Sequence, residues 1–164
     1  MIHGPTIRPA EDRDSDAIWK ILEPVIREGA TYPLDPGTGR EGAFAYWFAP
    51  DKQVFVAEVG GDLLGTYYIK PNSTGPADHV ANAGYMTHAE ARGRGIATAM
   101  AQDSFTRAGA AGFTAMQFNL VIATNEQAVR LWQKLGVQVV GRLPLAFRHK
   151  RLGLVDALVM YKLL

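Results

Sequence analysis

Apolar positions in the first part of the chain predict a short strand followed by an amphipathic helix. Thr6 to Arg8 form a brief β candidate. The acidic stretch from Glu11 to Asp16 supplies capping residues, and apolar side chains then recur at helical spacing at Ile18, Ile21, Leu22, Val25 and Ile26. Pro24 predicts a kink in this helix, and Gly29 predicts its end.

Strand-like and helix-like runs alternate over the rest of the chain. Segments 54–59 and 63–70 flank Gly60-Gly61 and predict an antiparallel hairpin. We further expect a loop at 32–39, a short helix at 42–48, a loop at 71–78, a strand at 79–88, a helix at 95–111, a strand at 114–122, a helix at 125–135, and strands at 137–141 and 155–162. The order predicts one mixed α/β sheet containing a right-handed parallel crossover, in a single domain spanning residues 1–164.

Composition narrows the classes of partner. The 164 residues are 48% hydrophobic, and 17 basic and 16 acidic residues are spread along the chain without a basic tail. We therefore expect a small-molecule or protein substrate and no nucleic-acid or membrane partner. The chain has no cysteine, which excludes disulfides, thiolate metal sites and a cysteine nucleophile. Residues 1–10 lack a secretory signal and no run approaches a membrane span, so a cytoplasmic protein is expected.

The most informative segment is the glycine turn Arg92-Gly93-Arg94-Gly95-Ile96-Ala97, which follows a predicted strand and opens a predicted helix. The first N–H groups of a helix lack intrahelical partners and carry the positive end of its dipole. Glycines let a phosphate approach the backbone closely, and Arg92 and Arg94 add positive charge. The segment therefore predicts a site for a phosphate or pyrophosphate group.

Spacing separates three kinds of phosphate-binding loop. A Walker loop needs Gly-Lys-Ser/Thr, which is missing here. A dinucleotide-binding loop needs a third small residue, where this chain has Thr98, and an acidic residue about 20 positions on, near which it has Asn119. The dinucleotide pattern therefore fits poorly without being excluded, and a coenzyme A loop is the third alternative.

The turn matches the Arg/Gln-x-x-Gly-x-Gly/Ala signature of the GNAT superfamily of acetyltransferases, and the chain resembles that family from about Thr6 to Leu163. A second similar segment comprises Ala123-Thr124-Asn125, Ala128, Leu131-Trp132, Lys134 and Leu135-Gly136. The resemblance implies the α/β (α+β) GNAT fold, with a mixed, mostly antiparallel sheet of about seven strands, a splayed parallel pair at its centre and about four helices.

The resemblance also implies acetyl-CoA as co-substrate and the residues that hold it. Gly84 fits a bulge in the central strand, and a backbone N–H near Met86 is expected to stabilise the oxyanion. Asn125 is expected both to cap the next helix and to approach the cofactor. The expected cofactor-binding residues are Tyr85, Met86, Thr87, Arg92, Gly93, Arg94, Gly95, Ile96, Ala97, Thr98, Asn125 and Trp132.

Direct attack of an amine on the thioester, without an acyl-enzyme, is the implied chemistry. Many family members place at Trp132 a tyrosine that protonates the leaving thiolate, and indole cannot do so. Either Tyr85 supplies that proton or the thiolate leaves unprotonated. Glu28 is the first candidate for the base, ahead of His79 and His88, and no histidine spacing indicates a metal.

The acceptor is expected to be a small, amino-acid-like amine. Segment 119–141 is similar to that of amino-acid and proline-analogue N-acetyltransferases. Candidate acceptor-binding residues are Tyr32, Asn119, Arg142, Arg148 and His149, whose basic members would suit a carboxylate. The apolar end of the chain, 154–164, predicts a homodimer. An acyl-CoA-binding regulator without catalysis and a nucleotide-binding or purely structural α/β domain are the alternatives.

Overall fold

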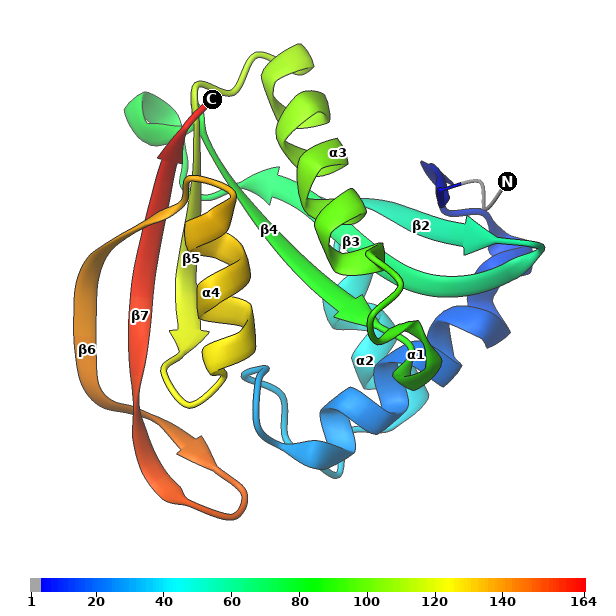
Figure 1. The fold of residues 1–164 in the computed structure, drawn as a ribbon, viewed down its shortest axis with the longest axis horizontal. Helices are drawn as coiled ribbons and strands as arrows, with labels where there is room; N and C mark the ends of the chain where they lie inside the picture. The colour runs from blue at the N-terminus through cyan, green and yellow to red at the C-terminus, as the bar shows by residue number, and fades with distance from the viewer. Residues whose placement is uncertain (1–3) are drawn as a thin grey trace.

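Strands and amphipathic helices alternate along residues 4–164, the part of the chain that the computed structural model describes (Figure 1). Within this part, seven strands form one sheet in the order β1-β2-β3-β4-β5-β7-β6. The strands are β1 (Thr6–Pro9), β2 (Gln53–Val59), β3 (Asp62–Pro71), β4 (Val80–Thr87), β5 (Ala115–Ile122), β6 (Gln138–His149) and β7 (Gly153–Leu163). The α-helices are α1 (Ser15–Glu28), α2 (Arg40–Trp47), α3 (Ile96–Ala110) and α4 (Glu126–Lys134).

The helices begin and end close to where local sequence signals place them. Helix α1 runs through Pro24 and ends at Gly29, whose φ of 60° is a left-handed conformation that glycine adopts without a steric penalty. Helix α3 begins directly after Gly95, with a φ of 73°. Asn125 caps α4, because its side-chain oxygen accepts the backbone N–H of Ala128 at 3.4 Å. No helix among the described residues is long and apolar enough to cross a membrane.

All neighbouring strands in the described sheet are antiparallel except β4 and β5, which run parallel. The α3 crossover links these two strands, as the order of elements predicts. The expected mixed, mostly antiparallel sheet with a central parallel pair and flanking helices is therefore confirmed.

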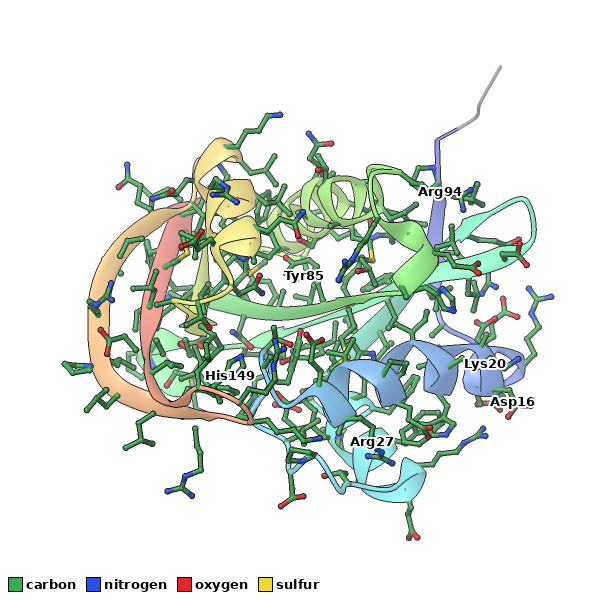
Figure 2. The ribbon with its side chains drawn as sticks, turned by 60° about the horizontal axis from the view of Figure 1, so that its bottom comes forward. Asp16, Lys20, Arg27, Tyr85, Arg94 and His149 are labelled. Carbon is green, nitrogen blue, oxygen red and sulfur yellow. The ribbon has the colours of Figure 1, made fainter. Side chains whose placement is uncertain are left out.

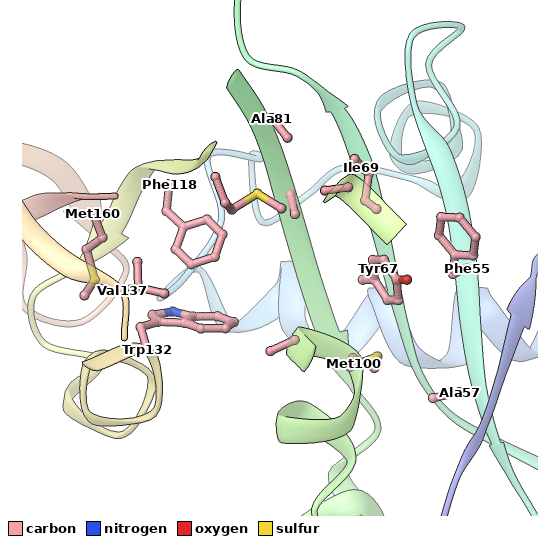
Figure 3. Close-up of a cluster of buried hydrophobic side chains, with 14 of the residues drawn as sticks. Phe55, Ala57, Tyr67, Ile69, Ala81, Met100, Phe118, Trp132, Val137 and Met160 are labelled. Carbon is pink, nitrogen blue, oxygen red and sulfur yellow. The ribbon is translucent and has the colours of Figure 1, made fainter. Parts of the chain in front are cut away.

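The two faces of the sheet have separate cores because side chains alternate along each strand. Tyr67 and Phe118 pack with α3 and α4 on one face, together with Met100 and Trp132 (Figure 3). On the other face, Tyr68 and Met86 pack with α1 and α2 together with Val56, Ile18, Ile21, Leu22, Ile26 and Trp47. Strand β4 thus contributes to both layers and carries contacts from either side of the sheet.

The structure explains the glycine at position 84 differently from the sequence analysis. We expected a bulge, but β4 pairs with β3 without any register shift, and Gly84 lies opposite Tyr68. A Cβ at position 84 would lie 2.6 to 2.8 Å from atoms of the Tyr68 phenol group. Glycine is required here because the tyrosine ring covers the strand closely.

The last two strands are longer than predicted. Instead of ending near Gly141, β6 continues to His149, and β7 begins at Gly153. The register of β6 shifts between Leu143 and Phe147, where Leu145 has a φ of 52°. This irregular segment, which contains Pro144, interrupts the alternation that marks a strand in the sequence.

The close contact at Gly84 makes a prediction. Gly84→Ala should lower the free energy of unfolding by about 1 to 3 kcal/mol, because Tyr68 has to move to admit the methyl group. Gly109→Ala is the matched control, since Gly109 lies within α3 with open space around it, and it should raise that free energy by about 0.5 to 1 kcal/mol. Urea unfolding of both variants measures the difference, and equal stability of Gly84→Ala and the wild type would contradict the assignment.

Candidate active site

The candidate site begins where β4 and β5 separate. They are paired only at Val80 with Ala115 and at Ala81 with Met116, and beyond these positions they diverge (Figure 1). A cavity of about 710 Å³ occupies the divergence and is lined from both strands, from α1 and α2, and from the start of α4. The cavity therefore reaches both faces of the sheet at its centre.

The backbone of Tyr85 faces this divergence. Its N–H donates to the Tyr32 hydroxyl at 2.6 Å, and the same hydroxyl donates to the Tyr85 carbonyl at 2.8 Å. Residues along an antiparallel strand alternate between those whose backbone groups face the partner strand and those that face away. The N–H and C=O of Tyr85 thus point away from β3, and those of Met86 point toward it. Of the backbone N–H groups near Met86, where we expected a donor for the oxyanion, the one that faces the divergence is that of Tyr85.

Tyr32 reaches β4 from the loop after α1. Its ring also packs edge-on against Trp47, with centroids 5.9 Å apart. Burial strongly raises the pKa of Tyr32, so its hydroxyl is protonated at neutral pH and acts as both donor and acceptor for Tyr85. A single side chain thereby satisfies two strand groups that a neighbouring β5 would otherwise bond.

The glycine turn lies at the far end of β4. Gly93 and Gly95 have φ values of 71° and 73°, and nothing lies within 4 Å of where their Cβ atoms would be. No side chain caps α3, so the N–H groups of its first turn are free of side-chain partners. Arg92 lines the large cavity, and both Arg92 and Arg94 are exposed. This end of the site is open and positively charged, which suits a phosphate group.

Tyr85 sends its side chain to the α3 face. Its hydroxyl lies 2.6 Å from that of Ser104, and Ser104 donates to the Ala101 carbonyl at 2.7 Å. Because Ser104 donates its hydroxyl proton to Ala101, Tyr85 is the donor in the hydrogen bond between the two hydroxyl groups. Burial raises the pKa of Tyr85, and the Ser104 hydrogen bond partly opposes the rise. The role of Tyr85 as the acid for the leaving group stays a prediction, and it would require this proton to leave Ser104.

Trp132 packs in the aromatic cluster of the same face. Its ring centroid lies 4.7 Å from that of Phe118 (Figure 3) and 4.9 Å from that of Tyr85. The indole is 8% exposed and lines the cavity. The structure thus gives Trp132 a packing role in the wall of the cavity, next to Tyr85.

The α1 and α2 face of the cavity carries the polar residues that could meet an acceptor. Glu28 and Asn119 both line it and are exposed. Asn119 donates to the Asn72 side chain at 2.6 Å. His88 also lines the cavity, and its ring nitrogen accepts the Glu90 N–H at 3.2 Å.

Four residues that were candidates for the base or for binding the acceptor do not line this cavity. Arg142 forms an ion pair with Asp156 at 2.6 Å, and His149 is buried with its Nδ1 accepting N–H groups of the following turn. Arg148 lines an adjoining cavity of about 290 Å³, which shares Tyr32, Pro33 and Leu120 with the large one. His79 is exposed beyond the start of β4. In the view of Figure 2, His149 lies on one side of Tyr85 and Arg94 on the other.

Sequence reasoning missed the lysines of the site. Lys52 and Lys70 line the large cavity beside Tyr46 and Tyr68. They come from a turn before β2 and from the end of β3, and no motif or spacing connects them. Among residues 4–164, no group of three or more His, Asp or Glu side chains is placed to hold a metal ion.

Comparison with known proteins identifies the family. The family model described as acetyltransferase (GNAT) matches residues 18–137, which is most of the chain. The chain belongs to the GNAT family of acetyltransferases. Over 151 residues this acetyltransferase is 33% identical to the N-acetyltransferase aca1 of Schizosaccharomyces pombe, an alignment that covers 82% of this chain and 72% of the yeast protein.

Solved structures agree with this assignment. A GCN5-related N-acetyltransferase from Kribbella flavida is 41% identical and superimposes with a TM-score of 0.92 over 98% of each chain. A phosphinothricin acetyltransferase from Sinorhizobium meliloti, solved in complex with acetyl-CoA, is 20% identical with a TM-score of 0.86 and covers 99% of this chain and 89% of its own. This second likeness concerns the fold. The expected family, fold and class of enzyme are confirmed.

Proposed function

We propose that this acetyltransferase moves the acetyl group of acetyl-CoA to the amine of a small, amino-acid-like molecule, by direct attack and without an acyl-enzyme. The observation that carries the proposal is the open divergence of β4 and β5, which faces the Tyr85 N–H and C=O and ends at an uncapped glycine turn. An extended pantetheine arm could bond these strand groups as an added strand does. The glycine turn at the other end is suited to its pyrophosphate.

Different residues would bind different parts of acetyl-CoA. Acetyl-CoA supplies an activated acetyl thioester. The backbone amides from Gly93 to Thr98 would hold the pyrophosphate, and the Tyr85 N–H would hold the carbonyl oxygen that gains negative charge as the amine adds. Thr87, whose backbone groups face the same way as those of Tyr85, would complete the strand edge, whereas those of Met86 are turned toward β3. The protein contributes alignment and a preformed hydrogen-bond donor, and the absence of cysteine is consistent with transfer in one step.

The acceptor would enter from the α1 and α2 face. Glu28, at the end of α1, lines that side of the cavity and is our candidate for the base that removes the amine proton. Tyr32 and Asn119 line the same side. A cavity of about 710 Å³ that also has to hold the end of the cofactor favours a small acceptor.

The experiment that tests the function combines calorimetric titration of acetyl-CoA with a free-thiol release assay. The acceptor panel contains amino acids, their carboxamides, polyamines and a lysine-containing peptide. We expect saturable binding of acetyl-CoA and thiol release with amino-acid-like amines. Binding without thiol release from any amine would favour the regulator suggested by Trp132. A protein that does not bind acetyl-CoA would contradict the proposal.

The Tyr32 hydroxyl competes with the cofactor in this account. Tyr32→Phe removes the group that bonds the Tyr85 N–H and C=O, so acetyl-CoA should bind about 3- to 10-fold more tightly, consistent with roughly one hydrogen bond of 0.5 to 1.5 kcal/mol. Tyr46→Phe is the matched control, because Tyr46 lines the same cavity and its hydroxyl contacts Tyr68 at 3.4 Å. Calorimetry measures both affinities. Weaker binding by Tyr32→Phe would mean that this hydroxyl contacts the bound cofactor.

Glu28→Gln tests the base. The turnover number at neutral pH should fall about 100-fold, the lower end of the range for a lost general base, while the affinity for acetyl-CoA stays within about 2-fold. Glu41→Gln on α2 is the control, since Glu41 is exposed and does not line the cavity. Unchanged turnover of Glu28→Gln with the preferred acceptor would remove Glu28 from the mechanism.

We also propose that two copies associate through β6 and β7. Exposed apolar side chains gather on this outer hairpin at Val139, Val140, Leu143, Leu145, Leu152 and Leu154. Such a patch at the edge of a sheet is typical of a protein interface. Light scattering at working concentration should give the mass of a dimer, and the mass of a monomer would reject the interface.

A further inference from the structure

Lys52 holds a positive charge inside the acceptor side of the cavity. Its ammonium nitrogen lies 3.6 Å from the centroid of the Tyr46 ring and 4.2 Å from that of Tyr68, and it donates to the Tyr46 carbonyl at 2.5 Å. Ring faces and a carbonyl stabilise a cation without neutralising it. Among residues 4–164, no carboxylate lies within 4.0 Å of this ammonium group.

Lys70 brings a second positive charge to the same wall. Its ammonium pairs with Asp51 at 3.5 Å, and the Asp51 side chain is 54% exposed. Burial, followed by repulsion from Lys70, lowers the pKa of Lys52 to about 8. Two ammonium groups thus belong to the lining of one cavity, and Asp51, a single and partly solvated carboxylate, compensates them incompletely. A net charge near +1 remains where the cavity excludes part of the water.

This charge arrangement is complementary to a monoanion. An anion in contact with both ammonium groups would relieve their repulsion and receive charge-assisted hydrogen bonds. A singly charged carboxylate matches the local excess of one positive charge, whereas a phosphate dianion would exceed it. On another part of the lining lies Glu28, whose charge suits the amine of the same molecule.

We propose that Lys52 and Lys70 form the subsite that binds the carboxylate of the acceptor, and that they determine the preference of the enzyme for amines that carry one. This inference rests on the proposed function and names its specificity determinants. It replaces Arg148, Arg142 and His149 as carriers of the carboxylate interaction, since the structure places these three outside the large cavity. Tyr46 and Tyr68 position the Lys52 ammonium.

The test compares amino acids with their carboxamides, because the two differ in the charge that the lysines would bind. L-proline with L-prolinamide and L-alanine with L-alaninamide are the probes, assayed by thiol release. The wild type should favour the acid over the amide by about 10-fold or more in kcat/KM. Lys52→Met and Lys70→Met should each raise KM for the acid by about 10-fold and leave KM for the amide and the affinity for acetyl-CoA unchanged.

Lys20→Met is the matched control, because Lys20 is exposed on α1 and lies outside the cavity lining (Figure 2). It should leave the ratio of acid to amide as in the wild type. Thermal unfolding confirms that each variant is folded, and a loss of structure would lower use of acid and amide together. A change in their ratio is therefore specific to the subsite.

Direct binding separates failure of the subsite from failure of the proposed function. Calorimetry with L-proline and L-alanine, in the presence of coenzyme A, should show binding that Lys52→Met weakens. Thiol release with acid and amide used equally well would overturn the subsite and leave the function standing. Carboxylate binding that depends on Lys52, without thiol release from any amine, would overturn the function alone. If the probes neither bind nor react, the subsite is overturned.

Discussion

Two neighbouring strands that part after two paired positions leave backbone groups that something else has to bond. Beyond Ala81 and Met116, β4 has no strand beside it on the β5 side, and a buried N–H or C=O without a partner is costly. In this structure the phenol of Tyr32 takes both groups of Tyr85. These two hydrogen bonds hold the loop after α1 against β4. The shape of the cavity and the access of a ligand to β4 therefore depend on them.

Side chains alternate along β4, so neighbouring residues of this strand point to opposite faces of the sheet. Tyr85 points to the α3 face, where it packs against Trp132 and Phe118, while Met86 packs under α1 and α2 on the other face. Gly84 presents no side chain and admits the Tyr68 ring against the strand. In the proposed function, the cofactor path and the acceptor wall would therefore lie on opposite sides of one strand. A cofactor on one side and an acceptor on the other would come into contact only through the gap between β4 and β5.

Local signals in the sequence predicted much of this arrangement. Gly95 before α3, Gly29 after α1, Asn125 before α4 and the Gly60-Gly61 turn each specify a backbone conformation or cap from a few neighbouring residues. The glycine turn could be recognised because its chemistry lies in consecutive residues. The longer β6 was missed because Pro144 and the residues around it break the alternation of a strand.

Features that depend on distant parts of the chain could not be predicted in the same way. Whether Tyr85 or Met86 faces the gap is decided by the register of β4 against β3. Lys52 and Lys70 meet only because the sheet brings two separate segments to one wall. Arg148 was expected at the acceptor site from its place in the sequence, but it lines an adjoining cavity beside β6.

The most direct test of the central claim is the amide resonance of Tyr85 during titration with acetyl-CoA, followed by nitrogen-15 NMR. If the cofactor takes the backbone groups now bonded by Tyr32, the Tyr85 amide should shift in a saturable manner, together with the amides of Gly93 and Gly95 and with the same dissociation constant. Saturation with acetyl-CoA that shifts other amides and leaves Tyr85 unchanged would contradict the account.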